Sequence, residues 1–500
     1  MASHASRASR TPRTGLSVAV LADSDTRWKW GALTARRLVP DHAELTGYLL
    51  RGRATPTARQ LGEVGVRADR LAEVTCPEFL AALERERPDV VVLALVGGAV
   101  QAVLHGVRAL WPEPAARPVL VTGYVGVVYE KLADGLLLRH GADLVLANSR
   151  HDAERFRAVY EGVGAAADSV TETALPFLAD AGPGGSHRSA DAAPSRALRV
   201  VFAVQPSVPE TRKDRAYLLG RAAGHARLHP DREVLVKLRS RPGEHTTHLE
   251  EAPYQRLAER IPGGLPPNCR LAYGNMGEVL DGTDLLVTVS STAALESLHR
   301  GIPTAVLTDL GIREALGNHH FLGSGCLASW DQLDSGLLPQ PDPSWLAAHG
   351  VPGAAASDTD APAPGAPGPA DPLTADPLTA DPLTADPLTQ AAGPAAPGYP
   401  APGDPYAAAR ARVAELAARP WLPPVDPYYT RTTAPGYLPG ILARQHLAPD
   451  GTPLPGTLRD TAGESRLRSL LRRQLREAAR GAYRHGVQRV APVIRRLGEL

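Results

Sequence analysis

Short apolar runs alternate with longer amphipathic stretches through the first part of the chain. The runs read "LSVAVLA", "DVVVLALV", "PVLVTG" and "ADLVLANS". Continuous apolar runs of this length are typical of strands buried on both faces, as in a parallel sheet covered by helices. The pattern predicts a Rossmann-like α/β domain over residues 14–180, preceded by a disordered tail at 1–13.

The same alternation starts again after residues 181–197, a small, polar stretch that contains prolines and has the composition of a linker. The new runs read "LRVVFAV", "EVLVKLR", "CRLAYG", "DLLVTVS" and "PTAVLTD". They predict a second Rossmann-like domain over 198–345. We expect a cleft between the two domains, because open α/β sheets bind ligands at the carboxyl ends of their strands.

The remainder of the chain has a different composition. Residues 346–404 are rich in proline and alanine and repeat "ADPLT" four times, which predicts a disordered linker. Residues 405–500 predict a helical, basic C-terminal extension, and the stretch 466–496 holds ten arginines and one acid. Two interpretations of residues 464–500 stay open: contact with an anionic membrane surface, or packing as a helical arm on the two domains.

Charge and cysteine content narrow the class of partner. The 54 basic and 53 acidic residues give a net charge of +1, so we expect no nucleic-acid partner. Three widely spaced cysteines form neither a disulfide framework nor a zinc pattern, and no run of 18 apolar residues occurs. A cytoplasmic location is expected, with peripheral contact at the inner face of the plasma membrane left open.

The segment "VTVSSTAALESLHRGIP" places hydroxyl side chains where a strand passes into a helix. The strand is expected to end near Ser290, and the helix to begin at Ser291 or Thr292. Such a turn predicts either an anion site at the start of a helix or an ordinary helix cap. Glu296 lies one turn further on, where its carboxylate could accept from ribose hydroxyls or face solvent.

The loop "LADSDTRWKWG" directly follows the first predicted strand. Asp23 or Asp25 would be the general base that takes a proton from an acceptor hydroxyl. Alternatively, these carboxylates cap the helix that follows. Arg27 and Lys29 would line the cleft beside them, and the two tryptophans of the loop would stack on a sugar or pack inside the domain.

A glycine-rich turn, "TGYVGVVYE", follows another strand of the first domain and places Gly123 and Tyr124 at the cleft. The chain contains neither GxGxxG nor GxxxxGK[ST]. The characteristic motifs of dinucleotide-binding and P-loop proteins are therefore missing.

The turn "SSTAALESLHRGIP" resembles the donor-binding half of GT-B glycosyltransferases, in particular the capsule-polymer and polysialyltransferase-like branch. In that branch a Ser/Thr pair of this turn binds donor phosphate. Together with "LADSDTRWKWG", "FAVQPSVPETRKDR" and "VLVKLRSRPGEHTTHLEE", the chain more closely resembles an uncharacterised bacterial family assigned to the glycosyltransferases. The resemblance covers residues 15–345 and implies a GT-B-like fold with a donor-binding second domain.

The chain departs from the polysialyltransferase-like pattern after "EVLVKLR". A His-Pro pair contacts the donor nucleotide in those enzymes, whereas this chain has Lys237, Arg239, Arg241 and His245. These cations would neutralise a phosphate or diphosphate leaving group without a metal, unless they form a solvated basic turn. The "HTTH" segment lacks the HExxH pattern of zinc enzymes, so we expect no metal and no cofactor.

These features predict a metal-independent glycosyltransferase. It would transfer a sugar from a CMP-, UDP- or GDP-linked donor to a glycan, polymer or lipid-linked acceptor in the synthesis of cell-surface polysaccharide or glycoconjugate. Two alternatives stay open: a sugar-nucleotide epimerase of the same fold, and a non-catalytic assembly factor at the membrane.

Overall fold

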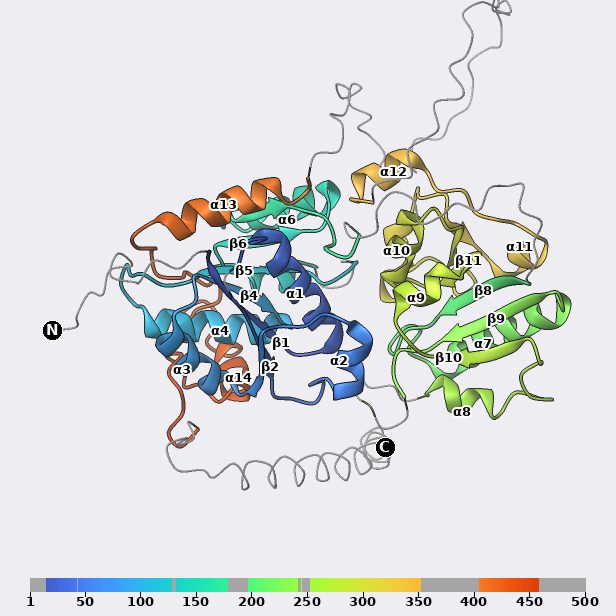
Figure 1. Cartoon of the computed structure of the whole chain (residues 1–500), viewed down its shortest axis with the longest axis horizontal. Helices are drawn as coiled ribbons and strands as arrows, with labels where there is room; N and C mark the ends of the chain where they lie inside the picture. The colour runs from blue at the N-terminus through green and yellow to red at the C-terminus, as the bar shows by residue number, and fades with distance from the viewer. Residues whose placement is uncertain are drawn as a thin grey trace, which may run out of the picture. The chain divides into compact units, whose positions relative to one another are not determined.

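The computed structural model describes residues 15–42, 44–127, 132–178, 197–241, 244, 252–351 and 404–457. Two sheets of parallel strands organise this part of the chain (Figure 1). The sheets hold the two tandem Rossmann-like domains that the apolar runs predict. Each sheet is described below with the helices that cover it.

The first sheet has seven strands in the order β3-β2-β1-β4-β5-β6-β7, all parallel. The strands are β1 (Ser17–Ala22), β2 (Glu44–Leu50), β3 (Arg70–Val74), β4 (Val90–Ala94), β5 (Val119–Gly123), β6 (Leu144–Ala147) and β7 (Val170–Glu172). Successive strands are added on one side of β1 up to β3 and on its other side from β4 onward, so the strand order reverses between β1 and β4. That reversal is the topological switch point, where sheets of this kind place ligands.

Helices cover both faces of the first sheet. They are α1 (Asp25–Leu38), α2 (Ala58–Val64), α3 (Cys76–Glu86), α4 (Gly97–Leu110), α5 (Leu132–Leu137) and α6 (Arg150–Gly162). Helix α1 begins because the Ser24 hydroxyl accepts from the Arg27 backbone N–H, and it then buries Trp28 and Trp30. A Cβ on Gly47 would lie 2.5 Å from the Trp28 ring, so only glycine fits in β2 at that point.

The second sheet has six parallel strands in the order β10-β9-β8-β11-β12-β13. They are β8 (Leu198–Ala203), β9 (Arg232–Lys237), β10 (Cys269–Ala272), β11 (Leu285–Thr288), β12 (Thr304–Leu307) and β13 (Leu327–Ala328). Its helical elements are α7 (Arg212–Leu228), α8 (Tyr254–Ala258), α9 (Met276–Asp281), α10 (Ala293–His299), η2 (Glu314–Leu316), η3 (Asn318–Phe321), α11 (Trp330–Asp334) and α12 (Pro343–Ala348). The switch point of this sheet lies between β8 and β11.

The predicted boundaries of the "SSTAALES" turn need correction. Strand β11 ends at Thr288 and helix α10 begins at Ala293, so the residues from 289 to 292 form a turn of their own. The Ser290 hydroxyl donates to the Leu316 carbonyl at 2.6 Å, and the Thr288 hydroxyl accepts from the Ser291 N–H at 3.2 Å. Side-chain bonds of this kind compete with regular backbone pairing, which shortens both elements.

The chain returns to the first sheet after residue 404. Helix α13 (Ala407–Ala418) contacts α1, β5 and β7, and helix α14 (Leu438–Arg444) packs on α4. Tyr406 is buried, and its hydroxyl donates to the Ala174 carbonyl at 2.8 Å. The described part of the predicted extension is therefore integral to the first domain's core. The predicted basic segment 464–500 lies outside the described residues.

None of the helices in the described ranges has the length and apolar character needed to cross a bilayer.

Candidate active site

The loop after β1 contains Asp23, which bridges the switch point of the first sheet. Its carboxylate accepts from the Val96 backbone N–H beyond β4 at 3.0 Å and from Arg27 Nη1 at 2.9 Å. Two strands that are neighbours in the sheet are thereby tied together where they end. Arg27 contributes to this arrangement through its ion pair with Asp23.

Asp25 lies two residues further on and meets a cation of the second domain. Arg239 Nη2 donates to Asp25 Oδ1 at 2.6 Å and also to the Thr26 hydroxyl. Burial alone would raise the pKa of Asp25, but the charge and hydrogen bonds of Arg239 and the bonds from Thr26 hold it below its ordinary value. A predicted base and a predicted donor-binding cation, 214 residues apart in sequence, therefore form one ion pair.

Lys237 is the last residue of strand β9 and lies two residues before Arg239 in the sequence. The residue is 7% exposed, and its ammonium group donates to the Leu238 carbonyl at 2.8 Å. Burial is the main reason that the pKa of Lys237 falls to about 8. A partly desolvated ammonium beside a guanidinium is suited to binding an anion.

A small cavity lies beside these cations at the carboxyl ends of β8 and β9. Its lining residues are Val204, Gln205, Pro206, Leu238, Arg239, Ser240 and Gln255. The Gln255 amide donates to the Ser240 carbonyl and to the Tyr273 hydroxyl, at 3.0 and 3.1 Å. Its buried Oε1 accepts no hydrogen bond from the residues that the structure describes. A ligand that donates a hydrogen bond would satisfy it.

Gln205 bridges the switch point of the second sheet. Its Oε1 accepts from the Ser290 backbone N–H at 3.0 Å. The Ser290 hydroxyl is buried and bonded to Leu316, while the Ser291 hydroxyl accepts from the Ala293 N–H at 3.2 Å. The N-cap residue of α10 is Thr292, whose side chain makes no capping hydrogen bond. The ordinary side-chain cap, one of the two interpretations of this turn, is therefore not formed at the N-cap residue.

Thr292 faces the first domain at the start of α10. A Cβ built on Gly126, in the turn after β5, would lie 2.3 Å from Thr292 Oγ1. One turn along α10, Glu296 lies 3.6 Å from Lys29 Nζ, and their side chains are 13% and 23% exposed. Residues predicted on the two sides of the site therefore meet here as well.

The glycine-rich turn of β5 is organised by a buried arginine that sequence reasoning missed. Arg139 donates to the Gly123 carbonyl at 3.0 Å and packs over the Tyr124 ring, 4.1 Å from its centroid. A Cβ on Gly123 would approach the Leu146 carbonyl to 2.8 Å, which explains the glycine. Tyr124 is thus held by Arg139 inside the first domain.

Two further predictions on the basic loop have different outcomes. Arg241 is exposed and lies 5.5 Å from the centroid of the Tyr273 ring, and its backbone N–H donates to Glu244 at 2.9 Å. His245 lies outside the described residues. Glu244 also pairs with Arg59 of α2, so this loop and the first domain are joined by a second ion pair.

The two tryptophans expected near the cleft lie in helix α1 and are too buried to stack on a ligand. Trp28 and Trp30 are 0% and 1% exposed, and Trp28 Nε1 donates to the Val66 carbonyl at 3.0 Å. Of the alternatives left open by the sequence, packing inside the domain is the correct one.

Sequence reasoning also missed Gln205, Gln255 and Arg59. A signal existed for Gln205, which follows β8 just as Asp23 follows β1. No comparable signal marks Gln255 or Arg59, because each lies on a helix away from the ends of the predicted strands.

Solved structures give distant matches. The S. aureus protein MnaA, in a co-structure with UDP, is 12% identical over 64% of this chain and 87% of that chain, with a TM-score of 0.43. The UDP-GlcNAc 2-epimerase from Neisseria meningitidis is 11% identical over 64% and 90% of the chains, with a TM-score of 0.42. The spinosyn rhamnosyltransferase SpnG is 16% identical over 64% and 88%, with a TM-score of 0.38.

Comparison with curated protein sequences gives no match. A family model, in contrast, matches residues 18–363, which include the second sheet and all of the first except Ser17. The matched range contains every candidate residue of the site described above. The chain belongs to the family described as "Putative glycosyltransferase (DUF6716)".

Proposed function

We propose that this chain transfers a sugar from a nucleotide sugar bound against the second sheet to an acceptor bound against the first. The observation that carries the proposal is the ion pair between Asp25 and Arg239, 2.6 Å long, at the carboxyl ends of β1 and β9. It places a carboxylate suited to proton removal beside cations suited to a phosphate leaving group. Transfer with inversion at the sugar carbon would use these two groups on opposite sides of that carbon, once donor phosphate has displaced Asp25 from Arg239.

The donor half of the proposal rests on Lys237, Arg239 and the start of α10. In the transition state the bond between the sugar carbon and the phosphate oxygen breaks, and negative charge gathers on the phosphate. The two cations would stabilise that charge, with the Ser291 and Thr292 hydroxyls as further donors. Side-chain cations supply the neutralisation in this scheme, so we propose a metal-independent reaction.

The acceptor half assigns different roles to the two aspartates. Asp23 holds the β1 and β4 loops together and is therefore a positioning residue. Asp25 would act as the base. When donor phosphate binds Arg239, the carboxylate loses its strongest partner and its pKa rises toward the ordinary value. Asp25 then accepts the proton of the acceptor hydroxyl while that oxygen bonds to the sugar carbon.

The proposal for the acceptor rests on the resemblance of the sequence to glycosyltransferases rather than on any single contact. We propose a glycan, polymer or lipid-linked acceptor in cell-surface polysaccharide or glycoconjugate synthesis. Glu296, Lys29, Arg241 and His245 complete the proposed site, with Glu296 on the ribose and Lys29 toward the acceptor.

The proposal is tested first by thermal unfolding of the full chain with CMP, UDP, GDP or dTDP. A ligand at one hundred times its Kd stabilises a protein by about 2.7 kcal/mol, so the true donor class should stand out. The effect should disappear in Arg239→Met and persist in Arg36→Met, a matched substitution on α1. Absence of a response to all four nucleotides would overturn the donor assignment.

The second test pairs Ser291→Ala with Thr292→Ala and uses Ser335→Ala as the matched control. We expect weaker nucleotide binding in the double variant and none of this loss in the control. Unchanged binding in the folded double variant would refute the role of this turn. Conversion of a lone nucleotide sugar to its isomer, without any acceptor, would identify an epimerase instead.

A further inference from the structure

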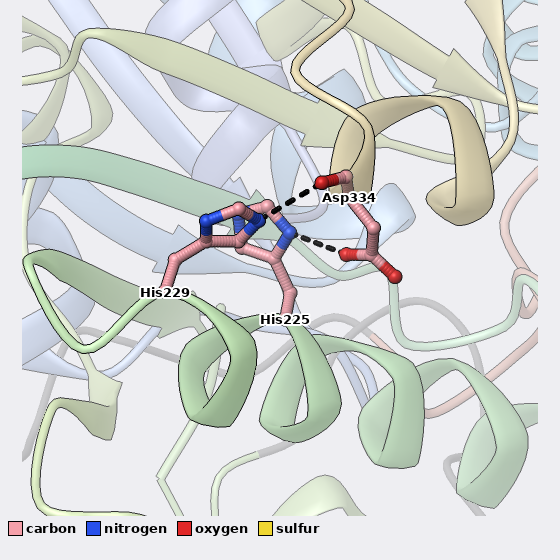
Figure 2. A group of neighbouring side chains, drawn as sticks. All are labelled: His225, His229 and Asp334. Atoms are coloured by element: carbon pink, nitrogen blue, oxygen red, sulfur yellow. Dashed lines mark hydrogen bonds and ion pairs between the residues drawn. The ribbon is translucent and has the colours of Figure 1, made fainter.

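Two histidines and an aspartate meet in the second domain, away from the candidate active site. His225 lies in the last turn of α7, His229 follows the end of that helix, and Asp334 ends α11 (Figure 2). His225 Nδ1 lies 2.6 Å from Asp334 Oδ1, and His229 Nε2 lies 3.1 Å from the Asp334 backbone oxygen. One potential ligand atom from each residue lies within 4.8 Å of the others.

The local structure brings these atoms together. The i,i+4 spacing of His225 and His229 places both imidazoles on one side of α7. The His225 side chain is 0% exposed, and its ring packs 5.6 Å from that of Trp330, so few rotamers are open to it. The C-terminal end of a 17-residue helix also favours a cation.

The charged neighbours leave one carboxylate oxygen for a ligand role. Arg221 Nη2 lies 3.0 Å from Asp334 Oδ2 and 2.6 Å from Asp331 Oδ1. It therefore occupies the other side of the Asp334 carboxylate and leaves Oδ1 facing the histidines. Arg232 Nη1 lies 3.2 Å from His225 Nε2 and is the cation that opposes a metal most directly.

We propose that His225 Nδ1, His229 Nε2 and Asp334 Oδ1 bind a divalent transition metal ion of the zinc class. Two imidazoles and a carboxylate are a ligand set that such ions prefer, and water would complete a tetrahedral shell. The ion would replace the proton that lies between His225 Nδ1 and Asp334. The neutral imidazole would then carry its proton on Nε2, so it could no longer accept a hydrogen bond from Arg232. His225 Nδ1 and Asp334 Oδ1, now 2.6 Å apart, would have to move apart to bind one ion at metal–ligand distances of about 2.0 to 2.1 Å.

The position of the site assigns the ion a structural role. His229 precedes the first residue of β9, whereas Lys237 of the candidate active site ends the same strand. The metal would therefore lie near the amino-terminal ends of the strands, whereas the donor would bind at their carboxyl ends. It would join α7 to α11. The metal site and the candidate active site have no residue in common. The metal proposal is therefore independent of the proposed function.

The test uses the full chain, stripped with a chelator and then titrated with Zn²⁺ in equilibrium dialysis and thermal unfolding. We expect one tightly bound ion per chain and a higher unfolding temperature. His229→Gln and Asp334→Asn should each weaken binding by about tenfold or more, with unchanged circular dichroism in chelator. Co²⁺ should give the strong visible absorption of a tetrahedral site in the parent chain only.

Two further variants serve as controls. One should leave Zn²⁺ binding unchanged, and the other should tighten it. His349→Gln alters the other histidine group, formed with His151 and His320, and should leave Zn²⁺ binding unchanged. Arg232→Gln removes an opposing charge and should tighten binding. The proposal is overturned if the parent chain retains no Zn²⁺, if His229→Gln binds as tightly as the parent, or if His349→Gln removes the binding.

Discussion

The two sheets bridge their switch points in the same way with different chemistry. In the first sheet the Asp23 carboxylate after β1 accepts from the backbone N–H of Val96 after β4. In the second sheet the Gln205 amide after β8 accepts from the backbone N–H of Ser290 after β11. The geometry is shared, but one bridge is anionic and the other is neutral.

This difference matches the roles that we propose for the two domains. A carboxylate-rich loop suits an acceptor hydroxyl that must lose a proton. A neutral amide beside Lys237 and Arg239 leaves their positive charge available to a phosphate. The comparison also separates a scaffold that both domains share from the charged residues that each adds to it.

The largest effect is expected from substitutions in the first domain's loop that carries Asp23 and Asp25. Asp25→Asn should lower kcat for transfer by about 10²- to 10⁴-fold, because the proton acceptor is lost, whereas nucleotide should bind at least as tightly, because Arg239 is released from its ion pair. Asp23→Asn keeps an oxygen for the Val96 N–H, so its loss of kcat should be much smaller. Steady-state kinetics with calorimetric nucleotide binding measures both. Equal losses in the two variants would contradict the separate roles.

The second-largest effect is expected when the neutral Gln205 bridge is replaced by an anionic one. Gln205→Glu retains an acceptor for the Ser290 N–H but brings negative charge close to the donor phosphates, so nucleotide affinity should fall by about tenfold. Gln205→Met, which lacks both the charge and the acceptor, separates repulsion from loss of the bridge. An unchanged dissociation constant for Gln205→Glu would place the phosphates elsewhere.

A pH dependence of several-fold is expected from Lys237. Burial lowers its pKa to about 8, so the free protein loses this charge as the pH rises through that value. Bound phosphate favours the charged form, and nucleotide affinity should therefore be highest below pH 8 and fall above it. Isothermal titration between pH 6.5 and about 9.5 measures the slope. Lys237→Met should flatten it, and an equal slope in that variant would exclude Lys237 as the cause.

The smallest expected effect concerns the ion pair between Lys29 and Glu296, whose atoms lie 3.6 Å apart. Partly exposed pairs of this kind contribute about 0.2 to 1 kcal/mol. A double-mutant cycle with Lys29→Met and Glu296→Gln in urea unfolding measures the coupling. Saturating nucleotide should reduce the coupling free energy between Lys29 and Glu296 if the Glu296 carboxylate accepts from the ribose hydroxyls instead. Coupling that nucleotide leaves unchanged would argue against that contact.

Much of the fold could be predicted because the central strands are buried on both faces. Strands β1, β4, β5 and β6, and β8 to β12 in the second sheet, all follow the apolar runs of the sequence. The missed strands are short or lie near an edge. Strand β3 shows four exposed positions out of five, and β2 contains Glu44, Thr46 and Gly47, so neither presents a continuous apolar run.

The candidate site could be predicted in part for the same reason. Polar residues that directly follow a buried strand, such as Asp23 and Asp25, are placed by the strand itself. The partners of these residues cannot be predicted in the same way. The contact of Asp25 with Arg239, for example, depends on how two separate sheets pack. Arg139 is equally hidden, since a buried arginine that bonds to carbonyl oxygens looks like a surface residue in sequence.

The return of α13 and α14 to the first sheet has a consequence for biosynthesis. A ribosome releases residues 198–328, and with them the whole second sheet, before it has made Tyr406 or Leu442, which complete the first domain's core. The second domain can thus mature first, although the first domain begins the chain. During that interval the nascent polypeptide would expose the apolar surface that α13 and α14 later cover.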